Sequence, residues 1–389
     1  FYTRSMVYTM PEFLERRYNP QSRTILSVIS LVSYVLTKVA VTVYAGGLVF
    51  QQVFGIKELW GIDFFWIAAI GLVVLTALYT IFGGMKSVLQ TPILLLGSLI
   101  ILVLGFKELG GWDEMMRVCG AVTVNDYGDT MTNLIRSNDD ANFPWLGALI
   151  GSAIIGFWYW CTDQFIVQRV LSGKNEMEAR RGTIFGAYLK LLPVFLFLIP
   201  GMIAFALHQK YIGAGGEGFL PMLANGTANA DAAFPTLVAK LLPAGVKGLV
   251  VCGILAALMS SLASLFNSSA MLFTIDFYKR FRPETPEKKL VGIGQVATVV
   301  IVILGILWIP IMRSVGDVLY TYLQDVQSVL APGIAAAFLL GICWKRTSAQ
   351  GGMWGLIAGM VIGLTRLGAK VYYSNAGEVA DSTFKYLFY

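Results

Sequence analysis

The sequence predicts an all-α membrane protein that forms a single helical bundle. Of its 389 residues, 56% are hydrophobic and 13% are charged, and the mean hydropathy is +0.68. A soluble domain of ordinary composition has about 25% charged residues. The apolar runs are continuous rather than alternating, which favours helices over a closed β-barrel. Short links join most of the runs, so we expect one transmembrane domain over residues 1–389.

About nine apolar spans follow one another along the chain, and each predicts one helix. A membrane-spanning helix needs about 20 mostly apolar residues. The spans lie near residues 24–55, 63–84, 88–106, 145–169, 184–208, 246–275, 290–312, 317–343 and 350–372. The first and sixth are long enough to tilt or bend. The eighth contains Pro332-Gly333, which should break or kink its helix.

The charges between the spans alternate in kind, which supports this number and order. Basic residues precede the first span and fill the second, fourth, sixth and eighth links: Arg16, Arg17, Arg23, Lys86, Arg169, Lys174, Arg180, Arg181, Lys279, Arg280, Arg282, Lys288, Lys289, Lys345 and Arg346. The positive-inside rule assigns those links to the cytoplasm. Two long links, near residues 107–144 and 209–245, are rich in Asp and Glu and belong outside. The net charge of +6 thus reflects topology, and we expect no nucleic-acid partner.

The sequence offers little for a metal centre or an enzyme. It has one histidine, His208, and its four cysteines show no paired spacing. It also has no GxSxG motif and no paired intramembrane aspartates, so we expect no enzyme activity. The chain begins at Phe1 without a methionine and ends as if a helix were starting, so we expect a fragment of a longer protein.

The most polar run inside a span reads FWYWCTDQ and lies in the fourth span. Ionisable groups at bilayer depth usually face a bundle interior or a wet cavity. If the span is one helix, one of its faces carries Gly156, Trp160, Asp163 and Val167. Tyr159 lies one turn before Asp163 on such a helix. An indole face beside hydrogen-bonding groups suits a sugar, whereas the alternative is an aromatic belt at the membrane interface.

Two further spans carry polar residues with open interpretations. Lys190 in the fifth span either snorkels to the inner surface or faces a cavity and donates to a solute hydroxyl. In the sixth span, small residues share one face: Ala257, Ser260, Ser261 and Ser264. They serve close packing of helices, or their hydroxyls and a free backbone carbonyl are oxygen ligands for a monovalent cation.

The eighth span places an amide stripe beside its proline. Gln324, Gln327 and Ser328 share a face there, and Pro332-Gly333 follows directly. Amides beside a kink are a plausible wall for a polar cavity.

Five segments together resemble the sodium/glucose cotransporter branch of the solute:sodium symporter family. They read TMPEFLERRY from Thr9, WYWCTDQFIVQR from Trp158, GAYLKLLP from Gly186, LMSSLASLFNSSAMLFTIDFY from Leu258 and APGIAAAFLLGICWKR from Ala331. The resemblance covers nearly the whole chain. It implies a leucine-transporter-type bundle with two inverted repeats of five helices. Residues 1–106 then hold the last three helices of the first repeat, residues 145–343 the second repeat, and residues 350–372 a peripheral helix.

The resemblance also implies the activity. It indicates a multi-pass protein of the cell membrane that couples sodium influx to uptake of a hexose such as glucose or galactose. Its partners are then the sugar, the sodium ion and the lipid bilayer. The implied sugar contacts are Tyr159 as inner gate, Trp160 as its stacking neighbour, and Lys190 and Gln324 as hydrogen-bonding groups. The implied sodium ligands are the carbonyl of Ala257 and the hydroxyls of Ser260 and Ser261.

Four positions depart from the family pattern. Gly156 stands where relatives have a hydrogen-bonding residue, and Gln327 where close relatives have Thr. Pro92 replaces an Asp of many relatives, and Ala263 replaces a Thr found where a second sodium is coupled. These last two favour one sodium per sugar. The alternatives are a symporter of myo-inositol or another small polar solute, and a sugar uniporter.

Overall fold

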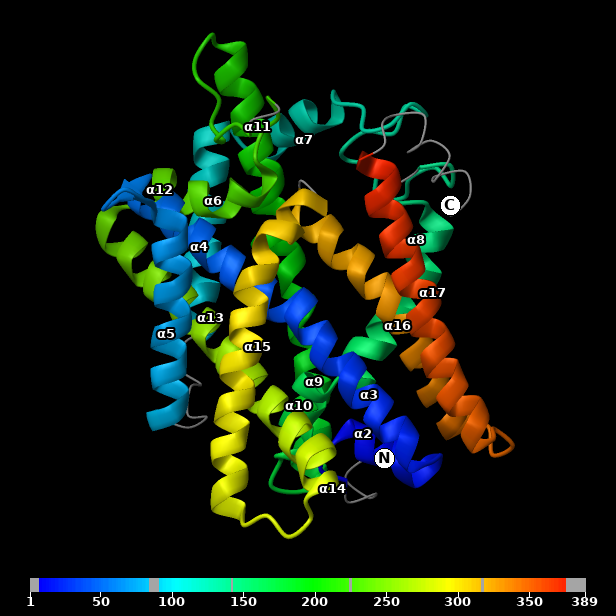
Figure 1. Ribbon diagram of the computed structural model, residues 1–389. Coiled ribbons are helices and arrows are strands. Elements are labelled where there is room, and N and C mark those ends of the chain that lie inside the picture. The colour runs from blue at the N-terminus through cyan, green and yellow to red at the C-terminus, as the bar shows by residue number, and fades with distance from the viewer. Residues whose placement is uncertain (1–6, 84–90, 141–142, 224–225, 316–317, 376–389) are drawn as a thin grey trace. The chain divides into compact units, whose positions relative to one another are not determined.

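The computed structural model describes residues 7–83, 91–140, 143–223, 226–315 and 318–375, which are almost entirely helical (Figure 1). The longer helices are α2 (Met10–Arg17), α3 (Pro20–Ser33), α4 (Ala40–Phe54), α5 (Phe64–Gly83), α6 (Thr91–Leu109), α7 (Trp112–Gly120), α8 (Trp145–Phe157), α9 (Gln164–Leu171), α10 (Glu176–Leu189), α11 (Ile199–Gly213), α12 (Ala233–Leu241), α13 (Ala244–Met271), α15 (Glu287–Val315), α16 (Leu319–Cys343) and α17 (Ala349–Asn375). Shorter elements are the one-turn helix α14 (Lys279–Phe281), the 3-10 turn η4 (Ala230–Ala232) and the hairpin of β1 (Glu58–Leu59) and β2 (Ile62–Asp63). In that hairpin Glu58 pairs with Asp63, antiparallel.

Four π-helical turns interrupt the long helices of the described chain: η1 (Tyr34–Val39), η2 (Trp158–Thr162), η3 (Val194–Leu198) and η5 (Leu272–Tyr278). A π-turn adds one residue to a helical turn and is common at functional sites. Three of the turns lie within membrane-length helices, and η2 ends the apolar stretch Trp145–Thr162.

The apolar spans are confirmed as helices. Among the described residues, seven helical stretches are long and apolar enough to cross a membrane: Pro20–Phe54, Trp145–Thr162, Glu176–Gly213, Ala244–Phe281, Glu287–Met312, Leu319–Cys343 and Ala349–Ala369. The pair Leu94–Leu109 and Trp112–Gly120 makes an eighth, bent by 75°, and Phe64–Leu78 is a shorter apolar helix. The link with Lys86 and the side chain of Pro92 lie outside the described part.

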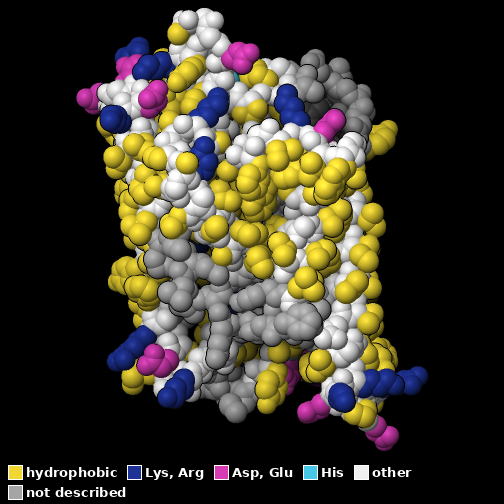
Figure 2. All heavy atoms as spheres, turned by 90° about the vertical axis from the view of Figure 1, so that its left-hand side faces the viewer, with side chains coloured by type: hydrophobic (Ala, Val, Ile, Leu, Met, Phe, Trp, Pro, Cys, Tyr) yellow, Lys and Arg dark blue, Asp and Glu magenta, His cyan; other side chains and the backbone are white. Residues whose placement is uncertain are grey.

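The helices form two compact units, each assembled from separate stretches of chain. Unit 1 contains residues 1–41, 141–183 and 264–389, and unit 2 contains residues 42–140 and 184–263. On the face shown in Figure 2, hydrophobic side chains are spread over the described helices, and most charged side chains lie toward the top and bottom of the view.

The core of unit 2 lies where α11 meets α6, α7 and α12. Its buried side chains include Ile101, Ile203, Leu207 and Leu237, each with less than 1% of its surface exposed. Gly105 of α6 lets α11 approach closely, because a Cβ there would lie 2.9 Å from the side chain of Ile203. This tight contact explains why an apolar helix carries glycine at that point.

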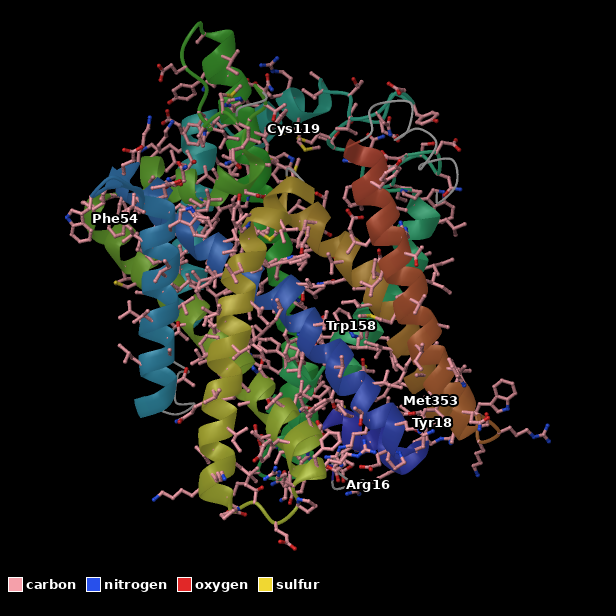
Figure 3. The ribbon with its side chains drawn as sticks, viewed as in Figure 1. Arg16, Tyr18, Phe54, Cys119, Trp158 and Met353 are labelled. Atoms are coloured by element: carbon pink, nitrogen blue, oxygen red, sulfur yellow. The ribbon has the colours of Figure 1, made fainter. Side chains whose placement is uncertain are left out.

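In unit 1 the segment before the first span is held against α16 and α17. The Tyr18 hydroxyl donates to the Ala337 carbonyl at 2.7 Å, and its ring lies against Gly352 (Figure 3). The Arg17 guanidinium donates to the carbonyls of Gly341 and Trp344, at the C-terminal end of α16. A cation at a helix C-terminus satisfies carbonyls that have no helical partner.

Of the break or kink expected at Pro332, the break is wrong. Helix α16 runs without interruption from Leu319 to Cys343, with Pro332 inside it. Gly333 has a different task, because a Cβ on it would lie 3.0 Å from the Cα of Gly359 in α17. The Pro-Gly pair therefore belongs to a close crossing of two helices, where a glycine on each side lets the backbones touch.

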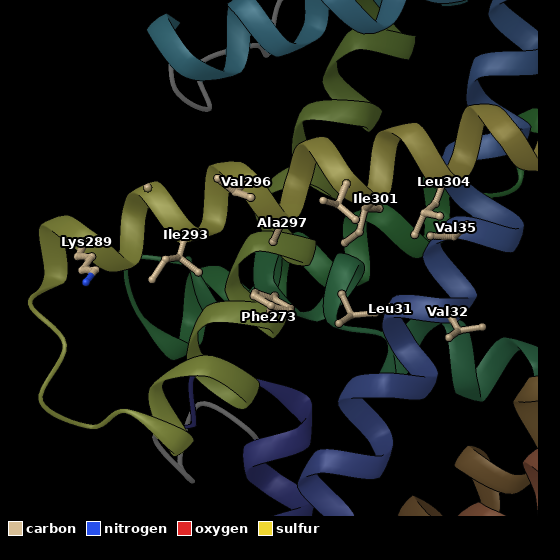
Figure 4. A pocket seen from close by; sticks show the side chains of 12 residues that line it. Leu31, Val32, Val35, Phe273, Lys289, Ile293, Val296, Ala297, Ile301 and Leu304 are labelled. Atoms are coloured by element: carbon tan, nitrogen blue, oxygen red, sulfur yellow. The ribbon is translucent and has the colours of Figure 1, made fainter.

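A groove of about 730 Å³ runs along α15 beside α3 and η1 in unit 1 (Figure 4). Its walls include Leu31, Val296, Ile301 and Leu304, and its single charged side chain is Lys289 at one end. None of the predicted solute or sodium ligands lines it. It is an apolar surface and not a candidate site for a polar solute.

Candidate functional site

The fourth predicted span breaks in the middle of the aromatic run. Helix α8 ends at Phe157, the π-turn η2 follows, and Asp163 is extended, with φ −79° and ψ 121°. Helix α9 then starts at Gln164, capped by the Asp163 carboxylate, which accepts from the Phe165 N–H at 3.1 Å. A backbone break at bilayer depth persists where protein or a cavity surrounds it.

This break corrects one expectation. Gly156, Trp160, Asp163 and Val167 do not share a face of one helix, because the chain leaves helical geometry at Asp163. The reason is local: a short acidic side chain caps a new helix better than it continues the old one.

The Asp163 carboxylate is the centre of a buried polar cluster. The Tyr34 hydroxyl donates to its Oδ1 at 2.8 Å, and the Lys38 ammonium forms an ion pair with its Oδ2. The Tyr34 oxygen also accepts from the Phe165 N–H at 2.9 Å. Only 2% of the Asp163 side chain and 11% of the Lys38 side chain are exposed. We call Tyr34, Lys38, Asp163 and Phe165 the Asp163 cluster.

Aromatic rings surround the cation of this cluster. The Lys38 nitrogen lies 4.5 Å from the ring centre of Phe165, 4.7 Å from that of Tyr34 and 5.3 Å from that of Tyr159. Ring faces attract a desolvated cation, which offsets part of the cost of burying it. The predicted gate residue Tyr159 is therefore in contact with an ion pair.

Sequence reasoning singled out Asp163 but missed Tyr34 and Lys38. Both lie in the first apolar span, four residues apart and hence on one side of a helix. A lysine inside such a span was the available signal, because an intramembrane cation needs a partner. Asp163, in the fourth span, was one of the carboxylates that could supply it.

The structure brings three of the four predicted sugar contacts into unit 1. Tyr159 is half-buried, and its ring meets that of Trp160 edge-on, with 5.4 Å between the ring centres. Trp160 is 44% exposed. Gln324 is half-buried on α16, the helix against which η2 packs.

Lys190 belongs to unit 2 and lies at an interruption between α10 and η3. Its N–H bonds to the carbonyls of Gly186 and Ala187, and the residue is exposed. A lysine at a helix break is better placed to reach a solute than one inside a regular helix.

The predicted sodium ligands lie on α13. Ala257, Ser260 and Ser261 are all partly exposed, and the helix is regular around them. The carbonyl of Ala257 therefore accepts a helical hydrogen bond and offers only its second lone pair. It is not the free carbonyl that the sequence analysis expected. Among the described residues no group of three or more His, Cys, Asp or Glu is placed to hold a metal ion. Neutral oxygens of this kind suit a monovalent cation.

A second buried carboxylate anchors the start of the chain in unit 1. Asp276 in η5 is fully buried, accepts from the Thr9 hydroxyl at 2.9 Å and pairs with Arg23 at 2.6 Å. Arg23 also pairs with Glu15 at 2.5 Å. Gln164, beside Asp163, accepts from the N–H of Met10 at 2.8 Å. The segment before the first span is thus bound to both η5 and α9.

Residues 1–359 match the sodium:solute symporter family. The chain belongs to this family. It is 37% identical over 383 residues to the human sodium/myo-inositol cotransporter 2, covering 94% of this chain and 56% of that protein. It is 38% identical to a sodium/mannose cotransporter of Bos taurus, covering 94% and 63%. It is 36% identical to the sodium/glucose cotransporter 4 of Mus musculus, covering 96% and 56%.

The fold agrees with a solved symporter. A sodium-coupled sialic acid symporter in a substrate-bound, outward-open state aligns with a TM-score of 0.72 and 21% identity, over all of this chain and 77% of that one. The leucine-transporter-type fold, the sodium/glucose branch and the multi-pass location in a cell membrane are therefore confirmed. The match is to transporters and not to enzymes. The assignment of the repeats and of the individual ligands stays a prediction.

Proposed function

We propose that the protein is a sodium-coupled symporter of a hexose such as glucose or galactose. The observation that carries this proposal is the break at η2, where the ring of Tyr159 lies beside a buried ion pair and Trp160 contacts that ring, in a sodium:solute symporter chain. The chain spans about three fifths of the curated relatives it matches, so the proposal concerns the whole protein.

In this mechanism the sodium ion binds the Ala257 carbonyl and the hydroxyls of Ser260 and Ser261. Sodium favours the outward-open state by binding it better than the inward-open state. The sugar then binds more tightly, since linkage between two ligands is reciprocal.

The sugar stacks on Trp160 and receives hydrogen bonds from Lys190 and Gln324. Tyr159 closes the inner side of the site. Its contact with Lys38 ties its position to the Asp163 cluster. Release to the cytoplasm requires Tyr159 to move, so the state of that cluster sets the height of the inner barrier.

The test is uptake by the full-length gene product in cells or proteoliposomes. We expect labelled glucose or galactose to accumulate against its gradient only when sodium is present outside. Equilibration without accumulation would identify a uniporter, and no sugar uptake at normal expression would refute the proposal.

A polyol is the second candidate solute. It is favoured by the 37% identity to a sodium/myo-inositol cotransporter. Competition separates the two: excess unlabelled myo-inositol should leave hexose uptake largely intact if a hexose is the substrate. If myo-inositol competes at lower concentration than glucose, the polyol is the substrate.

A further inference from the structure

Two neighbouring side chains of α9, Gln168 and Arg169, donate hydrogen bonds to Ser264 of α13. The Arg169 guanidinium donates to the Ser264 hydroxyl at 2.8 Å, and the Gln168 amide donates to the Ser264 carbonyl at 3.2 Å. The same carbonyl accepts from the Ser268 hydroxyl at 2.8 Å. Only 5% of Ser264 is exposed. We call Gln168, Arg169 and Ser264 the Ser264 clamp.

The clamp lies one helical turn from the predicted sodium ligands. Ser260 and Ser261 precede Ser264 by four and three residues, and α13 is regular from Ala244 to Met271. Residues at these spacings share one side of an α-helix and lie about 4.5 to 6 Å apart along its axis. A small shift or rotation of this stretch therefore displaces Ser264 with it.

The other end of the clamp leads directly to the Asp163 cluster. Helix α9 has eight residues, and its N-cap is Asp163 itself. The ring of Phe165 has the Arg169 guanidinium 5.1 Å and the Lys38 ammonium 4.5 Å from its centre. A short helix held at both ends moves as a rigid body. A displacement of Arg169 therefore also displaces the N-cap Asp163 and the residues around Tyr159.

We infer that the Ser264 clamp transmits sodium occupancy from α13 to the Tyr159 gate, with Gln168 and Arg169 acting as positioning residues. This inference rests on the proposed function. Neither residue touches sodium or sugar in this role. Their effect is to make α9 move together with α13. Sodium binding on α13 then changes the position of the residues at the η2 break.

The native Cys161 provides a direct readout of the gate. It lies in η2 next to Trp160 and is exposed. In full-length protein whose other accessible cysteines are replaced by Ser, a membrane-permeable maleimide should label Cys161 at a rate that sodium changes several-fold. The rate is measured across a sodium titration without sugar.

Three variants test the clamp in that background. Ser264→Ala and Arg169→Gln should reduce the sodium response of Cys161 labelling to less than half, while Arg169→Lys, which keeps a charged donor, should restore part of it. The matched control is Ser269→Ala on the same helix, since its buried hydroxyl makes no hydrogen bond within the described part of the chain. It should respond like the parent protein.

The outcomes separate the clamp from the proposed function. If the parent responds to sodium and both Ser264→Ala and Arg169→Gln respond equally, the clamp is refuted and the symport proposal stands. If the parent neither responds nor shows sodium-dependent uptake, the proposed function fails and the clamp with it. Should one variant fail to reach the membrane, the other and Gln168→Ala give the same comparison.

Discussion

At the scale of single residues, the Lys38–Asp163 pair decides the local structure. Both side chains are buried, so their charges are costly unless they remain paired. Asp163 also caps α9, which means that one carboxylate stabilises a helix start and neutralises an intramembrane cation. Few residues in the described chain carry two such tasks.

Removing the cation should therefore be more harmful than removing both charges. We expect Lys38→Met to lower the free energy of unfolding by about 3 to 5 kcal/mol, because Asp163 is left buried and unpaired. Lys38→Met combined with Asp163→Asn should recover most of that loss, since Asn still caps a helix. Thermal unfolding in lipid nanodiscs measures both. Equal melting temperatures for the single variant and wild type would contradict a role for the pair in holding η2.

A loop residue of unit 2, Asp129, should respond to acid. Hydrogen bonds from the Asn125 amide, the Ser137 N–H and the Asn133 amide hold the pKa of the Asp129 carboxyl below its usual range. A carboxyl with a lowered pKa in the folded state stabilises the loop above its unfolded pKa, near 4. That stabilisation is lost as pH falls through the lowered value. Hydrogen exchange of this loop should accelerate in that range beyond the intrinsic rate change, and Asp129→Asn should abolish the extra change.

At the scale of elements, charged and capping residues fix how helices begin and where they are held. The Thr9 hydroxyl accepts from the Glu12 N–H to cap α2, and Asn19 followed by Pro20 starts α3. Such helix starts can be predicted from the local sequence. The anchoring of α2 and α3 to η5 through Asp276 cannot, because Asp276 and its partners Thr9 and Arg23 are more than 250 residues apart.

The anchor at Asp276 can be tested with two arginines, Arg23 of α3 and Arg16 of α2. Arg23→Met should destabilise the protein by about 3 to 5 kcal/mol, because Asp276 has no exposed side-chain surface and loses its counter-charge. Arg16→Met is the matched control: its side chain is 51% exposed in a pair with Glu12, worth less than about 1 kcal/mol. If both variants melt together, the buried pair contributes no more than a surface one.

The crossing of α16 and α17 makes a second prediction at this scale. A Cβ on Gly359 would lie 2.6 Å from the Cα of Gly333, whereas a Cβ on Gly355 would meet nothing within 4 Å. We expect Gly359→Ala to lower stability by about 1 to 3 kcal/mol through overpacking. Gly355→Ala, one turn earlier, should be neutral or slightly stabilising in a helix. Unfolding monitored by thermal shift compares the two, and the same sign for both would argue against a close crossing.

The breaks in the helices mark the limit of prediction at this scale. Hydropathy identified the spans because burial in lipid demands apolar residues along a whole helix. It did not show the break at η2, since the Asp163 carboxylate that caps α9 there is held by Tyr34 and Lys38, more than 120 residues away. Conversely, Pro332-Gly333 suggested a break or kink, whereas α16 continues through both residues and Gly333 lies close to Gly359 of α17.

At the scale of the whole molecule, the predicted ligands are distributed over both units. Tyr159, Trp160 and Gln324 belong to unit 1, while Lys190 and the α13 ligands belong to unit 2. Composition and charge alternation predicted a multi-pass bundle because they reflect the solvent around every helix. The identity of the solute depends on a few contacts, and it cannot be predicted from composition or charge alternation.

The two ligand sets should affect different kinetic parameters. Ser261→Ala removes one proposed sodium ligand and should raise the sodium concentration for half-maximal uptake about tenfold, equivalent to about 1.4 kcal/mol. Lys190→Ala should raise the sugar concentration for half-maximal uptake and change the sodium requirement less. Uptake titrated against each solute tests this, with Ser268→Ala as control. Unchanged uptake in both variants at normal expression removes the basis for these assignments.

The long sequence separation of the two buried ion pairs has a consequence for biosynthesis. Lys38 meets a partner made 125 residues later, and Arg23 one made 253 residues later. At about 5 to 20 residues per second, Arg23 waits roughly 10 to 50 s after its own synthesis. During that time both cations need water, lipid headgroups or the insertion machinery as temporary partners. Completion of unit 1 is consequently a late event, and a nascent chain stopped before Asp276 carries unpaired charges next to a membrane.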